Sequence, residues 1–91
     1  MSETRYTIAW TPPARRAIKR LPEKVATAVV EFAYGSLAGN PHRVGKALTL
    51  ALEGMHSARR GDYRVVYRID DKQHRVEVVM VDHRADVYRP G

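Results

Sequence analysis

The sequence predicts an α+β fold in which a helical hairpin packs on one face of a mostly antiparallel, four-stranded sheet. Three features of the hydrophobic pattern support this prediction. A stretch with the alternation of a strand comes first, two stretches with helical spacing follow it, and three strand-like stretches come last. The predicted order is therefore β-α-α-β-β-β. Because the two helices are adjacent in the chain, we expect them to cover one face of a single sheet.

The first predicted strand and the first predicted helix occupy residues 6–10 and 12–21. Tyr6, Ile8 and Trp10 alternate with smaller residues, which is typical of a half-buried strand. The threonine that follows can cap a helix, and the two prolines after it are tolerated in a first helical turn. The apolar stripe of this helix leaves a basic ridge on its outer side, formed by Arg15, Arg16, Lys19 and Arg20.

Turn residues set the bounds of the remaining elements. A second helix is predicted from residue 22 to about residue 37, and Gly39-Asn40-Pro41 ends it. Residues 42–52 carry a weak pattern and are predicted to form a connector that leads into a strand. Three strands joined by short polar turns, which allow antiparallel pairing, are then predicted at residues 55–60, 63–69 and 75–81.

The composition favours one cytoplasmic domain with a polyanionic partner. A chain of 91 residues has room for one core, so residues 1–91 are expected to form a single domain. Cysteine is absent, which fits a reducing compartment, and no stretch approaches the ~20 apolar residues of a membrane span. A net charge of +6 and a pI near 10.1 favour nucleic acid as the partner. A surface that is basic without a specific function is the alternative.

Arginines of the middle predicted strand point to a phosphate site. Arg64 and Arg68 share the face opposite to the apolar side chains, because side chains alternate across a pleat. Arg59 and Arg60 lie just before the turn into this strand. A guanidinium matches phosphate oxygens and stays charged at any working pH, so these residues predict a cationic surface for RNA or DNA. The alternative is that arginines on a sheet face only keep the surface soluble.

The C-terminal residues carry groups suited to proton transfer. His83, Arg84 and Tyr88 follow the last predicted strand, and a histidine exchanges protons near neutral pH. His83 is therefore a candidate acid or base, with His56 as an alternative; a solvent-exposed histidine without a role is the competing interpretation. The sequence lacks phosphate-binding glycine loops, paired cysteines and zinc-binding helix motifs, so we expect neither a metal nor a cofactor.

With these residues in place, the chain resembles the RelE/ParE toxins of bacterial type II toxin–antitoxin pairs over nearly its whole length. The resemblance rests on Arg20-Leu21-Pro22 after the first helix, Asn40-Pro41 after the second, LEGMHSARRGDYRVVY at residues 52–67 and HRADVY at residues 83–88. The segment GDYRVVY is its most specific part. The combination is most similar to the RelE branch found in actinobacteria.

The resemblance implies cleavage of messenger RNA in the decoding site of the ribosome, by attack of a ribose 2′-hydroxyl on the adjacent phosphate and without a metal. It implies that Arg64 stabilises charge on the phosphate and that Arg59 is a basic residue of the site. Arg84 and Tyr88 match residues that assist the leaving group and position the RNA. Partners implied are the ribosome, messenger RNA and a RelB-like antitoxin, an acidic peptide or small protein that silences the toxin.

The sequence also departs from the family pattern. Ser57 stands where well-known RelE enzymes carry a lysine, so one proton acceptor of the family is missing, and His83 is favoured over His56 as its substitute. The chain ends at Gly91, shortly after Tyr88, and a short tail is expected to weaken ribosome contacts. Two alternatives stay open: a ParE-like inhibitor of DNA gyrase, and a ribosome binder with weak catalysis that slows translation without cutting RNA.

Overall fold

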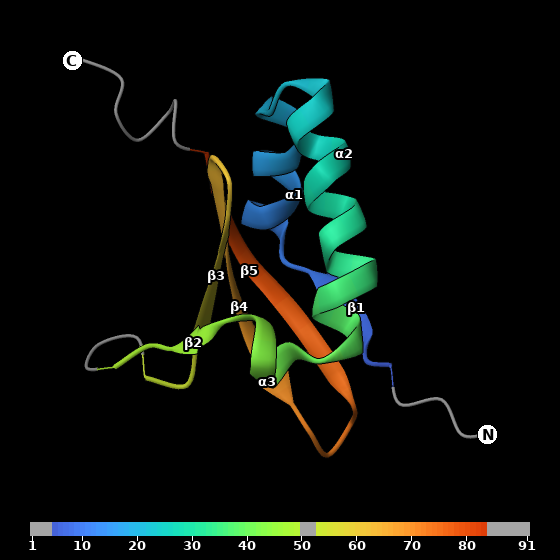
Figure 1. Cartoon of the computed structure of the whole chain (residues 1–91), viewed down its shortest axis with the longest axis vertical. Coiled ribbons are helices and arrows are strands. Elements are labelled where there is room, and N and C mark those ends of the chain that lie inside the picture. The colour runs from blue at the N-terminus through green and yellow to red at the C-terminus, as the bar shows by residue number, and fades with distance from the viewer. Residues whose placement is uncertain (1–4, 50–52, 84–91) are drawn as a thin grey trace.

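A five-stranded sheet with helices on one face forms the framework of the computed structural model, which describes residues 5–49 and 53–83 (Figure 1). The elements in chain order are β1 (Thr7–Trp10), α1 (Pro12–Arg20), α2 (Glu23–Phe32), the π-helical segment η1 (Ala33–Leu37), α3 (Pro41–Val44), β2 (Lys46–Ala47), β3 (His56–Arg60), β4 (Tyr63–Asp70) and β5 (Arg75–His83). In the described residues, α1 and α2 lie together against one face of the sheet and leave the other face open. We call these the helix-covered face and the open face.

The strands are arranged in the order β1-β5-β4-β3-β2. β3, β4 and β5 form the antiparallel meander that the sequence predicts, and β1 pairs with β5 in parallel. The prediction of four strands is wrong by one. The predicted connector contains α3 and then the two-residue β2, which pairs antiparallel with β3.

The short strand β2 depends on a close approach between its neighbours. A side chain at Gly45 would collide with the Tyr67 hydroxyl and the Ser57 carbonyl oxygen, so the chain can pass here only with glycine. The backbone nitrogen of Leu48 donates to the carbonyl oxygen of Met55 (2.8 Å), which extends the pairing by one bond. A strand of two residues has no hydrophobic period, so sequence patterns do not detect it.

Helix α1 forms as its cap and its apolar stripe predict. The Thr11 hydroxyl accepts from the backbone nitrogen of Ala14 at 3.3 Å, and the prolines occupy the first helical positions. Ala14, Ala17 and Leu21 are buried against the sheet, while all four residues of the basic ridge are exposed. The predicted ridge is therefore confirmed as a surface of the helix layer.

The second predicted helix is one helical run that changes its winding. It begins at Glu23 as α2 and continues through η1, where the helix widens into π geometry before Gly39. Val29 and Leu37 are fully buried on its inner side. None of the helices in the described residues combines the length and apolar character that a bilayer span requires.

The core lies between these helices and the central strands. Val65 and Tyr67 of β4 and Val76 and Val78 of β5 are fully buried. The Tyr67 hydroxyl donates to the carbonyl oxygen of Pro41 at 2.7 Å, which satisfies a polar atom that burial would otherwise penalise. Because the buried positions alternate along β4, the residues between them are presented on the open face.

Candidate nucleic-acid site

Two arginines stand side by side on the open face. Arg59 of β3 and Arg64 of β4 are directly opposite each other in the antiparallel register, so their side chains project from the same face. Both are exposed. Like charges at opposing positions of a sheet disfavour folding, and an anion held between them relieves the repulsion. Two adjacent guanidiniums can hold the nonbridging oxygens of a phosphate with several charge-assisted hydrogen bonds.

A β-bulge brings a carboxylate to Arg64. Val66 pairs with Met80, but Tyr67 pairs with Val78, so Val79 is an extra residue on β5. The bulge reverses which side chains face the core: Val76 and Val78 are buried before it and Val81 after it. Asp82 consequently lies on the open face opposite Arg64, with 3.8 Å between its Oδ2 and the Arg64 guanidinium.

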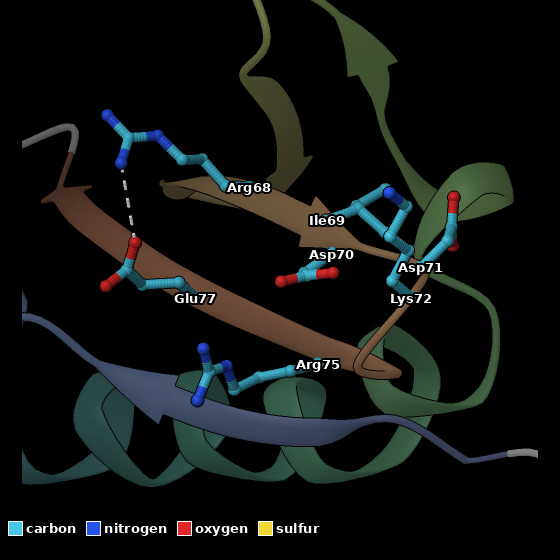
Figure 2. A pocket seen from close by; sticks show the side chains of 7 residues that line it. All are labelled: Arg68, Ile69, Asp70, Asp71, Lys72, Arg75 and Glu77. Atoms are coloured by element: carbon cyan, nitrogen blue, oxygen red, sulfur yellow. Dashed lines mark ion pairs between the residues drawn. The ribbon is translucent and has the colours of Figure 1, made fainter.

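Arg68 lies on the open face of β4, four residues beyond Arg64, in a different electrostatic setting. Its guanidinium is 3.5 Å from the Glu77 carboxylate of β5. Figure 2 shows this pair at the edge of a pocket where β4 turns into β5. The charged residues that line the pocket are three bases and three acids, so their formal charges cancel: Arg68, Lys72, Arg75, Asp70, Asp71 and Glu77.

Lys46 belongs to the open face as well. It is directly opposite Ser57 in the register of β2 and β3, and Ser57 shares its face with Arg59 two residues later. The diagonal separation of such positions is about 7–8 Å between Cα atoms. The Lys46 ammonium can therefore reach the surface around Arg59. Lys46 is not among the site residues predicted from the sequence, because β2 has only two residues and was not predicted.

Arg60 does not join the other arginines. Its guanidinium lies over the Phe32 ring, 4.7 Å from the ring centre, and one of its nitrogens donates to the Arg59 carbonyl oxygen at 2.8 Å. A cation over an aromatic face stabilises packing by about 0.5–1 kcal/mol at an exposed site. Its predicted contact with RNA stays a prediction, and the structure gives it a second role at the helix-covered face.

Neither candidate histidine shares the face of Arg64. His83 is opposite Tyr63, and Tyr63 faces the helices, where its hydroxyl donates to the Ala28 carbonyl oxygen at 3.4 Å. His56 stacks on the buried Tyr67 ring with 5.5 Å between ring centres. Burial chiefly lowers the pKa of His56; the electrostatic effect of nearby His42 also lowers it, and that of Asp71 partly opposes this. Nδ1 of His56 has no hydrogen-bond partner.

A polar cluster closes the far end of the sheet, where β4 turns into β5. The Asp71 carboxylate accepts from the Tyr6 hydroxyl at 2.6 Å and lies 2.9 Å from Nε2 of His42 on α3. The Tyr6 hydrogen bond, followed by the His42 hydrogen bond, lowers the pKa of Asp71. Tyr6 also stacks on His74. These contacts hold Tyr6, α3 and the β4–β5 turn together.

The remaining predicted site residues lie elsewhere. The basic ridge is part of the helix layer, so the sheet separates it from the open face. Arg84 and Tyr88 lie outside the described residues. The structure thus brings together Arg59, Arg64 and, farther along the same face, Arg68, and it adds Lys46 and Asp82 to them.

Comparison with known proteins agrees with this fold. The model of the family "ParE toxin of type II toxin-antitoxin system, parDE" matches residues 8–88. The chain is 58% identical over 84 residues to Toxin RelE of Mycobacterium tuberculosis, which covers 92% of this chain and 87% of that protein. It is 54% identical over 84 residues to Toxin RelG of the same organism, with 92% and 97% covered.

Solved structures give the same result. A chain in the crystal structure of the toxin–antitoxin complex RelBE2 from M. tuberculosis superposes with a TM-score of 0.89 at 50% identity, covering 93% of this chain and 98% of that one. The isolated E. coli RelE toxin superposes with a TM-score of 0.70 at 20% identity, covering 91% and 90%. The second likeness concerns the fold alone.

Proposed function

This chain belongs to the RelE/ParE family of toxins of type II toxin–antitoxin systems, and on that premise we propose that it is a ribosome-dependent endoribonuclease. It cleaves messenger RNA in the decoding site, without a metal ion, by attack of a ribose 2′-hydroxyl on the adjacent phosphate. The observation that carries the proposal is the pair Arg59 and Arg64 on the open face. Such a reaction needs fixed positive charge at the phosphate.

The chemistry assigns a role to each arginine. Negative charge builds up on the nonbridging oxygens as the phosphorus becomes five-coordinate, and preorganised guanidiniums stabilise that charge more than they stabilise the ground state. Arg64 is central because it has Arg59 on one side and Asp82 on the other. By resemblance to the family, Arg84 and Tyr88 assist the leaving group and hold the RNA.

The partners follow from the same premise. The ribosome and its message present phosphates to the basic ridge and to the open face, and Arg60 and Arg68 extend this surface. A RelB-like antitoxin, an acidic peptide or small protein, silences the toxin by covering these charges. Because ribosomes are the site of action, we propose that the protein works in the cytoplasm.

A ParE-like inhibitor of DNA gyrase is the second candidate, since the matching family model is that of ParE. The 58% and 54% identities to toxins named RelE and RelG favour the ribonuclease. The decisive experiment adds the purified protein to translating ribosomes and, separately, to a gyrase supercoiling assay. New RNA ends within ribosome-bound message support the proposal. Blocked supercoiling, or arrested translation without new ends, contradicts it.

A further inference from the structure

The open face contains a carboxylate next to the arginine of the proposed phosphate site. Asp82 lies opposite Arg64 in the sheet register, 3.8 Å from its guanidinium, and its side chain is 39% exposed. Asp82 is therefore accessible to a bound RNA, and its position within β5 fixes its backbone. We propose that Asp82 is the general base that removes the proton from the attacking 2′-hydroxyl; this inference rests on the proposed ribonuclease function.

The β-bulge is what places this carboxylate. Without the extra residue Val79, the alternation of β5 would direct Asp82 to the same face as Val76 and Val78. Thr11 fixes the bulge: its hydroxyl donates to the Val79 carbonyl oxygen at 2.8 Å, and its backbone nitrogen donates to the Val78 carbonyl oxygen at 3.0 Å. β-bulges recur beside active sites, where they redirect a side chain.

Among the described residues, few other acids on the open face could take the role of general base. The charged groups that face Asp82 are Arg64 on β4 and, one strand further, Arg59 on β3. Its chain neighbour His83 projects toward Tyr63 on the helix-covered face. The other carboxylate opposite a β4 arginine on this face, Glu77, is paired with Arg68 farther from Arg59.

The proposed step is balanced in protons and electrons. The 2′-hydroxyl gives its proton to the Asp82 carboxylate, and the 2′-oxygen forms a bond to phosphorus. The bond from phosphorus to the 5′-oxygen breaks, and that oxygen leaves with the electron pair and takes a proton from water. The products are a 2′,3′-cyclic phosphate and a 5′-hydroxyl, and Asp82 then releases its proton to solvent.

The test is single-turnover cleavage of ribosome-bound message between pH 5 and pH 9. Asp82→Asn keeps the size of the side chain but cannot accept the proton, so we expect about a hundredfold loss of rate. The wild-type rate should also fall toward acidic pH, and this fall should be absent from Asp82→Asn. Glu77→Gln is the matched control, since it removes the acid of the other arginine pair and should leave the rate and the pH profile unchanged.

Two further variants separate a base from a residue that only orients Arg64. Asp82→Ala should regain activity in added formate, because a small carboxylate can replace a missing base but cannot orient a guanidinium from solution. His83→Ala should keep the acidic fall in rate. The inference is overturned if Asp82→Asn retains the wild-type rate, or if it is slow but retains the acidic fall and Asp82→Ala is not rescued by formate.

The outcome also distinguishes this inference from the proposed function. If the wild-type protein produces no RNA ends on ribosomes, the ribonuclease proposal itself fails. If the wild type cleaves and Arg64→Ala does not, while Asp82→Asn cleaves normally, only the assignment of the base fails. Thermal melting of every variant checks that the fold is intact, which is expected because Asp82 is not part of the core.

Discussion

Arg64 and Arg68 occupy the same strand and the same face, and each faces an acid on β5, but their other neighbours differ. Arg64 has Arg59 opposite it on β3. The pairing of β3 with β4 ends at Tyr67, so Arg68 has no residue opposite it on β3. Arg68 instead borders a pocket whose formal charges cancel (Figure 2). One end of the open face thus carries excess positive charge and the other is balanced. We expect the second cross-strand arginine to distinguish Arg64, at the reacting phosphate, from Arg68, farther along the same face.

The largest effect that this comparison predicts is at Arg64. Arg64→Ala should reduce the single-turnover rate on ribosome-bound message by about a hundredfold or more, which corresponds to roughly 3 kcal/mol of transition-state stabilisation. Arg64→Lys should recover part of the loss, because a point charge cannot reproduce the two-pronged contact. Cleavage by Arg64→Ala at the wild-type rate would remove the basis for distinguishing the two ends.

Lys46 should extend the positively charged end toward β2. Lys46→Met removes the charge and keeps a side chain of similar length. We expect about a tenfold lower cleavage rate, the effect of losing roughly one exposed contact to a phosphate. Lys72→Met, in the balanced pocket, is the matched control and should have no effect. Lysine on an edge strand can also serve only to prevent aggregation. In that case Lys46→Met would cleave normally and would self-associate in sedimentation experiments.

The basic ridge is a third positively charged region to compare with the two ends of the open face. Its four charges are exposed on the helix layer and do not border the site. Reversing Arg15 and Arg16 to Glu should weaken ribosome binding several-fold and make it less sensitive to salt, since fewer counterions are released. The rate at saturating ribosome should stay unchanged. Binding by the wild type that does not vary between low and moderate salt would argue against phosphate contacts by the ridge.

These regions differ in how far the sequence predicts them. The ridge and the alternation of β4 follow from regular periods, so the faces of Arg64 and Arg68 could be assigned from sequence alone. The role proposed for Arg64 comes from the resemblance to a family, because a hydrophobic period says nothing about chemistry. The cap of α1 could also be predicted, from a threonine that precedes two prolines.

What the sequence did not predict depends on tertiary contacts. Asp82 reaches the open face only because Val79 bulges, and the bulge is tied by Thr11, 68 residues away in the chain. Lys46 joins the site through a strand of two residues that relies on the close approach at Gly45. His83 was favoured as a base from its position in the chain, but the same bulge directs it toward the helices. Local periodicity contains no signal for such events.

At the balanced end, removing a charge should have little effect on catalysis. Arg68→Ala should lower cleavage by less than about threefold, because Glu77 already offsets the charge of Arg68. The double variant with Arg68→Ala and Glu77→Gln should match the wild type closely. A loss as large as that of Arg64→Ala would show that RNA also binds across the pocket.

The smallest effect on activity is expected at Asp71, which lines the same pocket but contacts the Tyr6 hydroxyl and His42. Its pKa in the folded protein lies below the ordinary value of 3.8, chiefly because the Tyr6 hydroxyl donates to it. The unfolded chain therefore binds a proton more readily, so the contribution of Asp71 to stability is present above pH 3.8 and is lost as the pH falls through the folded pKa.

Asp71→Asn should consequently cleave RNA like the wild type. Its melting temperature should be slightly lower at pH 7, and the difference from the wild type should shrink as the pH is lowered below 3.8, because the wild type then loses the same contribution. Thermal melting from pH 7 to pH 2.5, alongside the cleavage assay, measures both effects. A variant that melts like the wild type at pH 7 but no longer cleaves would assign this polar cluster to the RNA surface, and the two ends of the open face would then act as one site.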